Sequence, residues 1–592
     1  MRAALQSLQK TPCRTHEITD EDRKAFPAIR HLQRYYPALD LFSTEASMGA
    51  ARKHLEFPTR YQVTAWLDET APKMWRAMRK DTSIESDDPT DAIFEPCDVF
   101  VKTVHLLNPV DLLRETYTCP EHPLLPQSES TWKNTLQKLH HHNNQAYVDA
   151  VANAVLSRFR EMDLTPHCIL SYGAFTGIRD IYRFNITPEY DSYRQCRWFW
   201  DGMESHRARL SVRHEMPVDD AWFAEIAQEL KTRPIDLDVG DLDTCEVLSI
   251  TPLEPSVVNP CEVMEYTFDT IEDAAENATD ILELHRKVTE SQPHVCESDT
   301  SETITESDDS TDSEEGFEID LEIPEMPVIV IAQEAQEGVM DALLDEDEID
   351  GFERGSQGWE ARWIAWLFQV VAGLTFLQSA ICFTHNDLHS NNILWRRTDQ
   401  RWLYYTAKDG TVWRVPTYGK IFTIIDFGRS IFRLGRRLWV SDDHWPDQDA
   451  GDQYNFGPFF DRQKPKVSPN PSFDLCRLAV SLLDGMFDEP PPKKKGKGVM
   501  AEVMSEEADG FKVYETRSPL YNLLWRWTVD DQKRTIYETS DGEEKYEGFE
   551  LYIRIAQDVH HVVPKDQLRR APFAFEWTEG VPAGEKAYAL GI

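Results

Sequence analysis

The sequence predicts an α+β protein. Residues 97 to 107, CDVFVKTVHLL, alternate between apolar and polar side chains as a half-buried strand does. Residues 144 to 162 and 359 to 378 have apolar residues at helical spacing, and residues 421 to 425 form a short apolar run. At 592 residues the chain exceeds what one hydrophobic core usually organises, so we expect two or more lobes or domains.

The chain is strongly acidic. It has 103 acidic and 62 basic residues, which gives a formal net charge of -41. This charge repels nucleic-acid backbones and anionic membrane surfaces, so we expect no nucleic acid and no membrane as a main partner. Phosphate chemistry in such a chain requires local positive charge.

Cysteine spacing and the N-terminus indicate the compartment. The ten cysteines are scattered singly, without a CxxC pair, which is typical of a reducing compartment. The first residues, MRAALQSLQKTPCR, lack the apolar core of a signal peptide, and we expect no apolar run long enough to span a bilayer. We therefore expect an intracellular, cytoplasmic protein. The lysine-rich segment 488–502, DEPPPKKKGKGVMAE, is predicted to be a surface loop and leaves nuclear import open.

An acidic stretch divides the chain. From Glu297 to Glu325 there are 13 acidic residues and no basic residue. Such a segment repels itself and buries little, so we expect disorder from Ser291 to Asp350, with a basic partner as one interpretation of its charge. The predicted parts are an N-terminal extension of unknown role (1–90), a β-rich region with insertions (91–290), an acidic disordered insertion (291–350) and a mainly helical region (351–592).

Two polar clusters stand next to apolar elements in the C-terminal part. The predicted helix 359–378, with Ser356 as its cap, is followed by HNDLHSNNIL at 385–394. The apolar run 421–425 is predicted to be a buried strand that ends at Asp426. Aromatic and β-branched residues flank Asp409-Gly410 between these clusters, which predicts a hairpin.

The chemistry of these clusters suits phosphoryl transfer. Asp387 and Asn392 are five residues apart in a loop, so one can face an incoming hydroxyl while the other turns toward a metal. Asp426 supplies the hard anionic oxygen that Mg²⁺ prefers. Phosphoryl transfer needs an oriented nucleophile, a group that accepts its proton, and metal ions that bridge the phosphate oxygens.

The two clusters together resemble the protein kinase superfamily. His385, Asp387 and Asn392 match its HRDxxxxN loop, and residues 426–428 match its DFG motif. The resemblance implies a bilobal protein kinase-like fold, with a small β-rich N-lobe and a mainly helical C-lobe, that binds ATP and Mg²⁺. It implies Asp387 as the catalytic base of a serine/threonine protein kinase, and Asn392 and Asp426 as metal ligands. It gives structural roles to His385, Phe427, Gly428 and Asp474, the last at the start of a helix predicted within residues 468–487.

The same resemblance implies a nucleotide site in the N-lobe. Lys102 is placed like the lysine that binds the phosphates, and Asp149 like the acid that holds this lysine. The segment SVVNPCEVMEYTFDTIED, residues 256–273, reads as a strand followed by a hinge. We therefore expect the backbone of Met264, Glu265 and Tyr266 to bind adenine.

Some features depart from the kinase pattern. Asn386 replaces an arginine, and His389 stands where Ser/Thr kinases have lysine, from where it can donate to a phosphate oxygen. No APE tripeptide precedes Asp474, and no glycine occurs from residue 50 to residue 172, where a Gly-rich loop is expected. A pseudokinase scaffold and a small-molecule phosphotransferase therefore stay open beside a protein kinase.

Within the superfamily, the combined pattern over residues 359–570 is most like kinase-like proteins of large nucleocytoplasmic DNA viruses. It includes FTHNDLHSNNIL, IIDFGRSIF and YEGFELYIRIAQDVHHVVPKDQL. If the protein is viral, the expected location is the cytoplasm of the host cell.

Overall fold

The structure is a computed structural model, and it describes most of the chain. The described residues are 13–15, 17–42, 55–83, 93–117, 133–214, 220–233, 317–446, 448–457, 460–487, 489–496, 498–503, 511–538, 544–546 and 548–592. The chain forms two compact units: unit 1 comprises Met1–Leu107, Thr118–Asp180 and Met326–Ile592, and unit 2 comprises Asn108–Tyr117 and Ile181–Glu325. All residues of the candidate site described below belong to unit 1.

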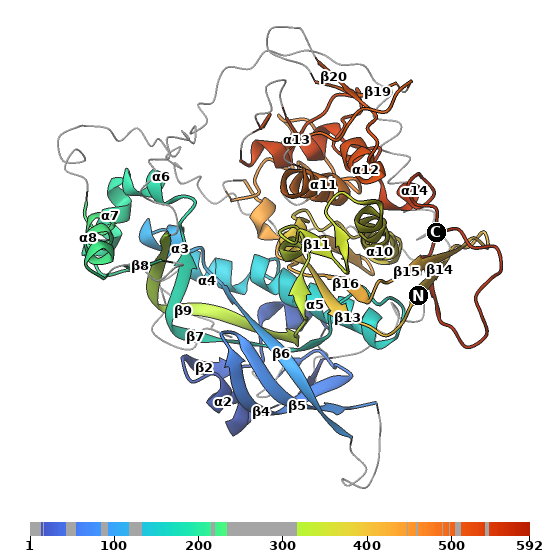
Figure 1. The fold of residues 1–592 in the computed structure, drawn as a ribbon. Coiled ribbons are helices and arrows are strands. Elements are labelled where there is room, and N and C mark those ends of the chain that lie inside the picture. Colours follow the sequence, from blue (N-terminus) through green and yellow to red (C-terminus); the bar gives the residue numbers. More distant parts are fainter. Residues whose placement is uncertain are drawn as a thin grey trace. The chain divides into compact units, whose positions relative to one another are not determined.

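A seven-stranded sheet is the largest β-structure among the described residues (Figure 1). Its strand order is β2-β7-β9-β6-β5-β4, and β8 pairs with β9 off this path. Strands β4, β5, β6 and β9 pair antiparallel, and Lys102 of β6 lies opposite Ile331 of β9. The strands are β2 (Ile29–Gln33), β4 (Tyr61–Ala71), β5 (Met74–Asp81), β6 (Phe94–His105), β7 (Ser171–Asn185), β8 (Arg209–His214) and β9 (Phe317–Glu334).

Five of the eight described α-helices of unit 1 lie in its C-terminal part. The helices of unit 1 are α2 (Asp20–Ala25), α4 (Lys133–His140), α5 (Gln145–Glu161), α10 (Gln357–Ile381), α11 (Phe473–Met486), α12 (Pro519–Trp527), α13 (Glu550–Asp558) and α14 (Pro564–Gln567). Those of unit 2 are α3 (Pro109–Leu113), α6 (Tyr190–Arg194), α7 (Arg197–Glu204) and α8 (Asp220–Leu230). The 3-10 helices are η1 (Pro37–Phe42), η6 (Asp341–Leu343), η7 (Ser390–Asn392) and η8 (Asp442–His444).

Short strands complete unit 1. They form the sheets β1-β3, β10-β13-β16, β11-β12, β15-β14-β21, β17-β18 and β19-β20. Their bounds are β1 (Arg14–Thr15), β3 (Leu55–Glu56), β10 (Gly338–Val339), β11 (Glu348–Ile349), β12 (Phe352–Glu353), β13 (Ile393–Arg397), β14 (Trp402–Thr406), β15 (Val412–Pro416), β16 (Lys420–Ile424), β17 (Ile431–Leu434), β18 (Arg437–Val440), β19 (Val499–Val503), β20 (Phe511–Tyr514) and β21 (Ala587–Ala589).

Helix α10 is a core helix of unit 1. Ser356 caps it as predicted, because the Ser356 side chain accepts a hydrogen bond from the Trp359 backbone N–H at 3.3 Å. The helix ends at Cys382, whose φ of 51° is left-handed. Contrary to the expectation from sequence, α10 is long and apolar enough to cross a membrane. Most of its residues are buried inside the protein, including Trp363, Trp366 and Phe368, so its apolarity is explained by the core.

Several predicted elements are confirmed with shifted ends. The strand expected at 97–107 is β6, the helix expected at 144–162 is α5, and the apolar run 421–425 largely coincides with β16. The hairpin around Asp409-Gly410 is formed by β14 and β15, with Tyr405 opposite Trp413. The mixed content of helix and antiparallel sheet is that of an α+β protein.

The predicted disorder of residues 291–350 is wrong for the part that the structure describes. Residues 317–334 form β9, which pairs with both β6 and β8. In its first half, Phe317, Ile319 and Leu321 are buried, and acidic residues stand between them. The predicted disorder rested on the high density of charge. The alternation of apolar and acidic residues is what forms the strand, because it places the apolar side chains on one face. Residues 291–316 lie outside the described residues.

Other predicted boundaries also change. The described part of residues 1–90 is no separate extension, because β2, β4 and β5 belong to the same sheet as β6. The C-terminal part begins before residue 351, since β10 already pairs with β13. In the predicted loop 488–502, residues from Val499 onward form β19 and pair with β20.

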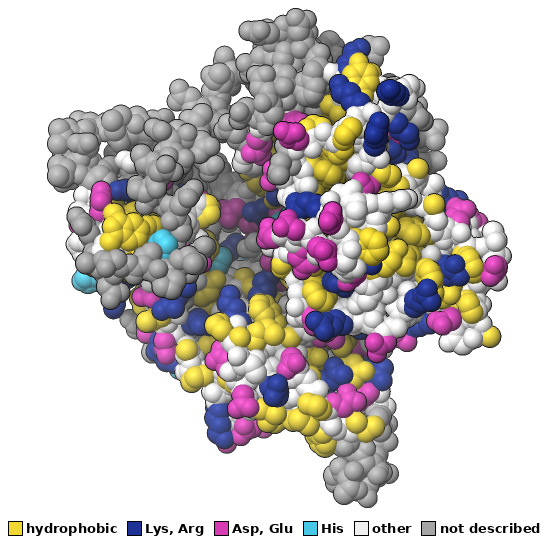
Figure 2. All heavy atoms as spheres, viewed as in Figure 1, with side chains coloured by type: hydrophobic (Ala, Val, Ile, Leu, Met, Phe, Trp, Pro, Cys, Tyr) yellow, Lys and Arg dark blue, Asp and Glu magenta, His cyan; other side chains and the backbone are white. Residues whose placement is uncertain are grey.

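The described surface carries both signs of charge. On the face shown in Figure 2, acidic and basic side chains are interspersed with hydrophobic ones. The excess of acidic residues in the whole sequence therefore leaves local positive charge available, as phosphate chemistry requires.

Candidate active site

Residues 385–392 form a loop between α10 and β13 whose backbone is held by α11. Asp474, in the first turn of α11, is fully buried and accepts hydrogen bonds from the backbone N–H groups of His385 and Asn386, each at 3.0 Å. Burial raises the pKa of Asp474, and the two N–H donors and His385 act against this rise. These hydrogen bonds agree with the structural role that the resemblance gives to Asp474.

His385 and Asn386 fix the other side of this loop. His385 Nε2 lies 2.7 Å from the carbonyl oxygen of Ile425, the residue before Asp426. Asn386 has a left-handed φ of 65°, and its side-chain amide donates to the Arg429 carbonyl oxygen at 2.9 Å. Tyr454 donates to Asn386 Oδ1 at 2.7 Å. Asn386 therefore has a structural role in place of the charge of the usual arginine.

Asp387, the predicted base, is partly accessible. Its side chain is 27% exposed. Its Oδ1 accepts a hydrogen bond from the Tyr552 hydroxyl at 2.7 Å, and its Oδ2 lies 4.0 Å from Arg429 Nη1. Among the described residues, no hydrogen-bond donor lies closer to Asp387 Oδ2 than Arg429 Nη1.

Asn392 is held within the loop by its amide nitrogen. Nδ2 donates to the Asp387 carbonyl oxygen at 2.8 Å and lies 3.1 Å from His389 Nε2. Because Nδ2 is the donor, this contact makes His389 Nε2 an acceptor. Burial lowers the pKa of His389, which keeps the ring neutral at pH 7. The Asn392 carbonyl oxygen Oδ1 is the remaining end, and it is the atom type that binds Mg²⁺.

Lys102 joins three elements that are far apart in the sequence. Its Nζ lies 2.7 Å from Asp149 Oδ2 on α5 and 2.8 Å from Asp426 Oδ1 after β16. Asp149 Oδ1 also accepts from the backbone N–H of Phe427 at 3.1 Å. The resemblance to kinases implies the contact between Asp149 and Lys102, and this contact is present. Their chemical roles stay a prediction.

The charges in this cluster are coupled. Burial opposes the charge of Lys102, but Asp149 and Asp426 outweigh burial, so the pKa of Lys102 is raised above its ordinary value. Burial likewise opposes the charge of Asp426, yet Lys102 lowers the pKa of this carboxyl group. Burial raises the pKa of Asp149, which is only 1% exposed. Asp426, 46% exposed, is the acid of the cluster that solvent or a ligand reaches.

The backbone around Asp426 brings it beside the loop of Asn392. The Ile425 N–H donates to the backbone carbonyl oxygen of Asn392 at 3.0 Å. Asp426 has a left-handed φ of 63°, which is uncommon for a non-glycine residue and typical of a functional constraint. Phe427 is fully buried beside the rings of Phe383 and His385.

The donor set fits a magnesium ion. Asp426 and Asn392 offer hard oxygen atoms from neighbouring segments, and Mg²⁺ commonly takes one or two protein ligands together with phosphate oxygens and water. Within the described ranges, no group of three or more His, Cys, Asp or Glu side chains is arranged to hold a metal ion without such extra ligands.

The segment after residue 428 is tied to the loop and to α5. Arg429 Nε donates to Asp443 Oδ2 at 2.8 Å. Asp442 Oδ2 forms an ion pair with Lys138 at 2.7 Å, and its Oδ1 accepts from the Gln145 backbone N–H at 2.8 Å at the start of α5. An anionic side chain at a helix N-terminus is favourable, so Asp442 helps to hold the helix that carries Asp149.

The glycine-free stretch before Lys102 contains the tip of the hairpin formed by β4 and β5. β4 and β5 are joined at Pro72 and Lys73, and Lys73 has a left-handed φ of 65°. The Lys73 carbonyl oxygen accepts from the Val101 N–H at 2.8 Å, so the tip reaches the level of Lys102. The β4–β5 tip thus forms a turn where a Gly-rich loop was expected, but it contains no glycine.

The predicted adenine-binding residues, Met264, Glu265 and Tyr266, lie outside the described residues. The strand that pairs with β6 is β9, and it is followed by residues 335–337. This segment contacts both the seven-stranded sheet and the C-terminal part of unit 1. Ala335 N–H donates to Asp98 O of β6, and Glu337 N–H donates to Trp395 O of β13.

Three functional candidates escaped the sequence reasoning: Tyr552, Arg429 and the segment 335–337. The apolar run VIVIA at 328–332, followed by polar residues and glycine, was a usable signal for a strand and hinge. For Tyr552 no local signal exists, since its contact with Asp387 spans 165 residues.

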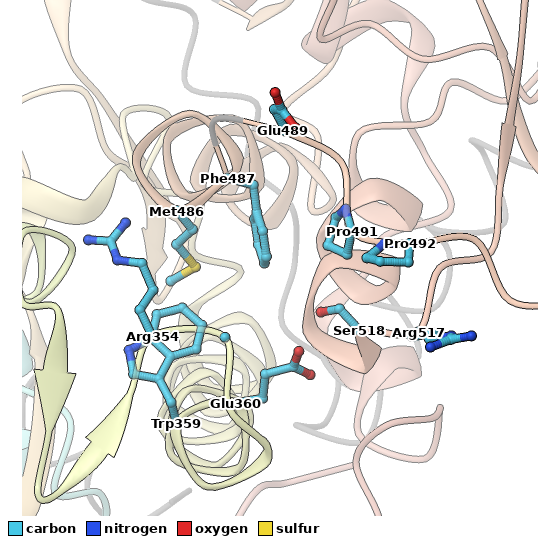
Figure 3. Close-up of a pocket in the computed structure, with 11 residues that line it drawn as sticks. Arg354, Trp359, Glu360, Met486, Phe487, Glu489, Pro491, Pro492, Arg517 and Ser518 are labelled. Atoms are coloured by element: carbon cyan, nitrogen blue, oxygen red, sulfur yellow. The ribbon is translucent and has the colours of Figure 1, made fainter.

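A cavity of about 610 Å³ lies at the other end of α10 (Figure 3). Its lining includes Trp359 and Glu360 at the start of α10, Met486 and Phe487 at the end of α11, and Ser518 before α12. Helix α10 has 25 residues and is therefore about 37 Å long, and the loop with Asp387 follows its opposite end. The cavity is thus separate from the candidate active site.

The chain matches no known protein-family model, and a search of curated proteins found no significant match.

Proposed function

We propose that this protein is a kinase-like phosphotransferase that uses Mg²⁺ and ATP to phosphorylate serine and threonine hydroxyls of protein substrates. The observation that carries the proposal is the contact of Lys102 with both Asp149 and Asp426. A lysine held by a buried acid on a helix, next to an accessible acid at a strand end, is the arrangement that protein kinases use for ATP phosphates and Mg²⁺.

The architecture of unit 1 supports a bilobal reading. The antiparallel strands β4, β5, β6 and β9 with α5 make up the proposed N-lobe, and α10 to α14 make up the proposed C-lobe. Residues 335–337 connect the two and take the role of the hinge. We propose that their backbone, in place of residues 264–266, binds the adenine ring.

The proposed roles follow from the atoms available. Lys102 binds phosphate oxygens while Asp149 holds its ammonium group in place. Asp426 and Asn392 Oδ1 hold Mg²⁺, which, when bound, neutralises charge on the phosphate oxygens. Asp387 orients the acceptor hydroxyl and takes its proton late in the transfer. Asp474 keeps the loop backbone in position through His385 and Asn386.

A pseudokinase is the second candidate, and the hairpin tip favours it. Glycines allow backbone N–H groups to approach phosphates closely, whereas Pro72 supplies no N–H and Lys73 carries a side chain. On this alternative the protein is a scaffold that presents acidic segments to a basic partner. A small-molecule phosphotransferase is the third reading, because His389 replaces the lysine of Ser/Thr kinases.

Phosphoryl transfer tests the proposal directly. Purified protein is incubated with γ-labelled ATP, Mg²⁺ and a mixture of protein substrates, beside Asp387→Asn and the exposed control Asp399→Asn. The proposal expects label on serine or threonine that falls at least about 100-fold in Asp387→Asn and is unchanged in the control. Equal label in all three proteins contradicts it, and label on metabolites alone favours the small-molecule reading. Binding of ATP without transfer favours the pseudokinase.

A further inference from the structure

Tyr552 is the closest side-chain partner of the proposed catalytic base. It lies on α13, and its hydroxyl is 2.7 Å from Asp387 Oδ1. The segments that carry these two residues belong to one combined sequence pattern, but that pattern does not indicate a contact between them. The contact therefore adds a residue to the candidate active site from a helix near the C-terminus.

The position of the Tyr552 hydroxyl is fixed by its surroundings. Arg477 Nε on α11 lies 3.1 Å from the hydroxyl oxygen. The ring stacks on Phe549 with a centroid distance of 5.1 Å and lies 5.8 Å from the ring of Phe473. Ring packing and the arginine together hold the hydroxyl in one place.

The direction of the hydrogen bonds follows from the donors. A guanidinium group only donates, so the Tyr552 oxygen accepts from Arg477 and its proton points to Asp387. Helix α11 thus holds the region of Asp387 through two residues. Asp474 binds the backbone N–H groups just before Asp387, and Arg477 holds the tyrosine that binds the Asp387 carboxylate.

The contact distinguishes the two carboxylate oxygens. Oδ1 is taken by Tyr552, whereas Oδ2 lies 4.0 Å from Arg429, whose Nε is bound to Asp443. An acceptor hydroxyl that approaches Asp387 therefore meets Oδ2, provided that the carboxylate does not rotate. The hydrogen bond from Tyr552 restricts this rotation.

We propose that Tyr552 is a positioning residue that locks the Asp387 carboxylate so that Oδ2 faces the acceptor hydroxyl. This inference rests on the proposed phosphotransferase function. Misplacing a reacting group by about 1 Å costs up to about 100-fold in rate, so the loss of this hydrogen bond affects the transfer step more than nucleotide binding.

The test compares Tyr552→Phe with wild type, Asp387→Asn and the double variant, and uses the exposed Tyr514→Phe as the matched control. Phenylalanine keeps the ring packing and removes only the hydroxyl. We expect kcat to fall about 10- to 100-fold in Tyr552→Phe while KM for ATP stays within about twofold. Because Tyr552 acts through Asp387, the double variant is expected to be no slower than Asp387→Asn.

A spectroscopic readout tests the contact itself. Burial raises the pKa of Tyr552, and Asp387 raises it further. NMR titration of ¹³C-labelled tyrosine is therefore expected to show a lower Tyr552 pKa in Asp387→Asn, and an unchanged value would overturn the contact.

Three activity results contradict the inference. A Tyr552→Phe protein with wild-type or higher kcat overturns it and makes the tyrosine neutral or inhibitory. Phosphate found on Tyr552 by mass spectrometry also overturns it, because the hydroxyl is then an acceptor. An inactive wild-type protein removes the proposed function and this inference together, whereas active wild type with fully active Tyr552→Phe removes the inference alone.

Discussion

Lys102 and Asp426 are 324 residues apart in the sequence, yet Lys102 Nζ lies 2.8 Å from Asp426 Oδ1. The same ammonium group contacts Asp149 at 2.7 Å. A strand, a helix and a strand end thus converge on one positive charge. Four predictions follow from this cluster and from the groups that hold it in place.

Replacement of Lys102 by methionine is expected to destabilise the fold. Asp149 is 1% exposed and loses its charged partner, and an uncompensated buried charge costs about 3 to 5 kcal/mol. Chemical denaturation at pH 7 measures the change in the free energy of unfolding. Lys408→Met, at an exposed position, is the control. A Lys102→Met protein as stable as the control would show that the ion pair does not stabilise the fold.

Asp474→Asn is expected to lower stability by about 2 kcal/mol. The carboxylate accepts from two backbone N–H groups in a fully buried place, and an amide turns at least one acceptor into a donor that faces a donor. Urea unfolding gives the stability, and hydrogen exchange of the His385 amide reports the loop directly. Unchanged exchange at His385 would contradict the anchoring role of Asp474.

Stability is expected to fall as the pH drops below about 6.5, in part because of His167. This buried ring contacts the Phe422 carbonyl and the Tyr405 hydroxyl, and burial lowers its pKa to about 3. Between pH 6.5 and 3 the unfolded chain binds a proton that the folded protein excludes, so each pH unit costs about 1.4 kcal/mol for this residue. His167→Gln is expected to show a shallower pH dependence in denaturation experiments. An identical slope would mean that the ring becomes protonated in the folded protein.

Lys73→Gly is expected to stabilise the hairpin tip. A non-glycine residue in the left-handed region costs about 1 kcal/mol, and Lys73 has a φ of 65°. Thermal unfolding measures the gain, and Lys80→Gly within β5 serves as a control that is expected to lose stability. Should Lys73→Gly be less stable than wild type, the lysine side chain contributes more than its backbone conformation costs.

The sequence identified the parts of the candidate site that depend on local patterns. The resemblance to kinases singled out Lys102 in a strand indicated by alternation, Asp149 in a helix indicated by apolar spacing, and Asp426 at the end of an apolar run. Strand β9 was missed because 13 acidic residues between Glu297 and Glu325 outweighed the buried alternation of Phe317 to Ile323. Residues 335–337, which follow β9, were missed with it.

Contacts between distant segments could not be predicted from sequence patterns. Tyr552 reaches Asp387 only because α13 packs against α11. Asp442 follows β18 and binds the start of α5, an element far from it in the sequence. The role of Asn386 could not be predicted either, because the sequence showed only that an arginine was absent. Its hydrogen bonds to Arg429 and Tyr454 give it a structural role.

Equilibrium binding of ATP tests the central claim, that Lys102, Asp149 and Asp426 form a nucleotide site. Isothermal titration calorimetry is carried out with and without Mg²⁺ on wild type, Asp426→Asn and the control Asp399→Asn. If the three residues form this site, binding depends on Mg²⁺ in wild type and in the control, and the affinity falls at least about tenfold in Asp426→Asn. No binding to the wild-type protein, or equal binding to all three proteins, would contradict it.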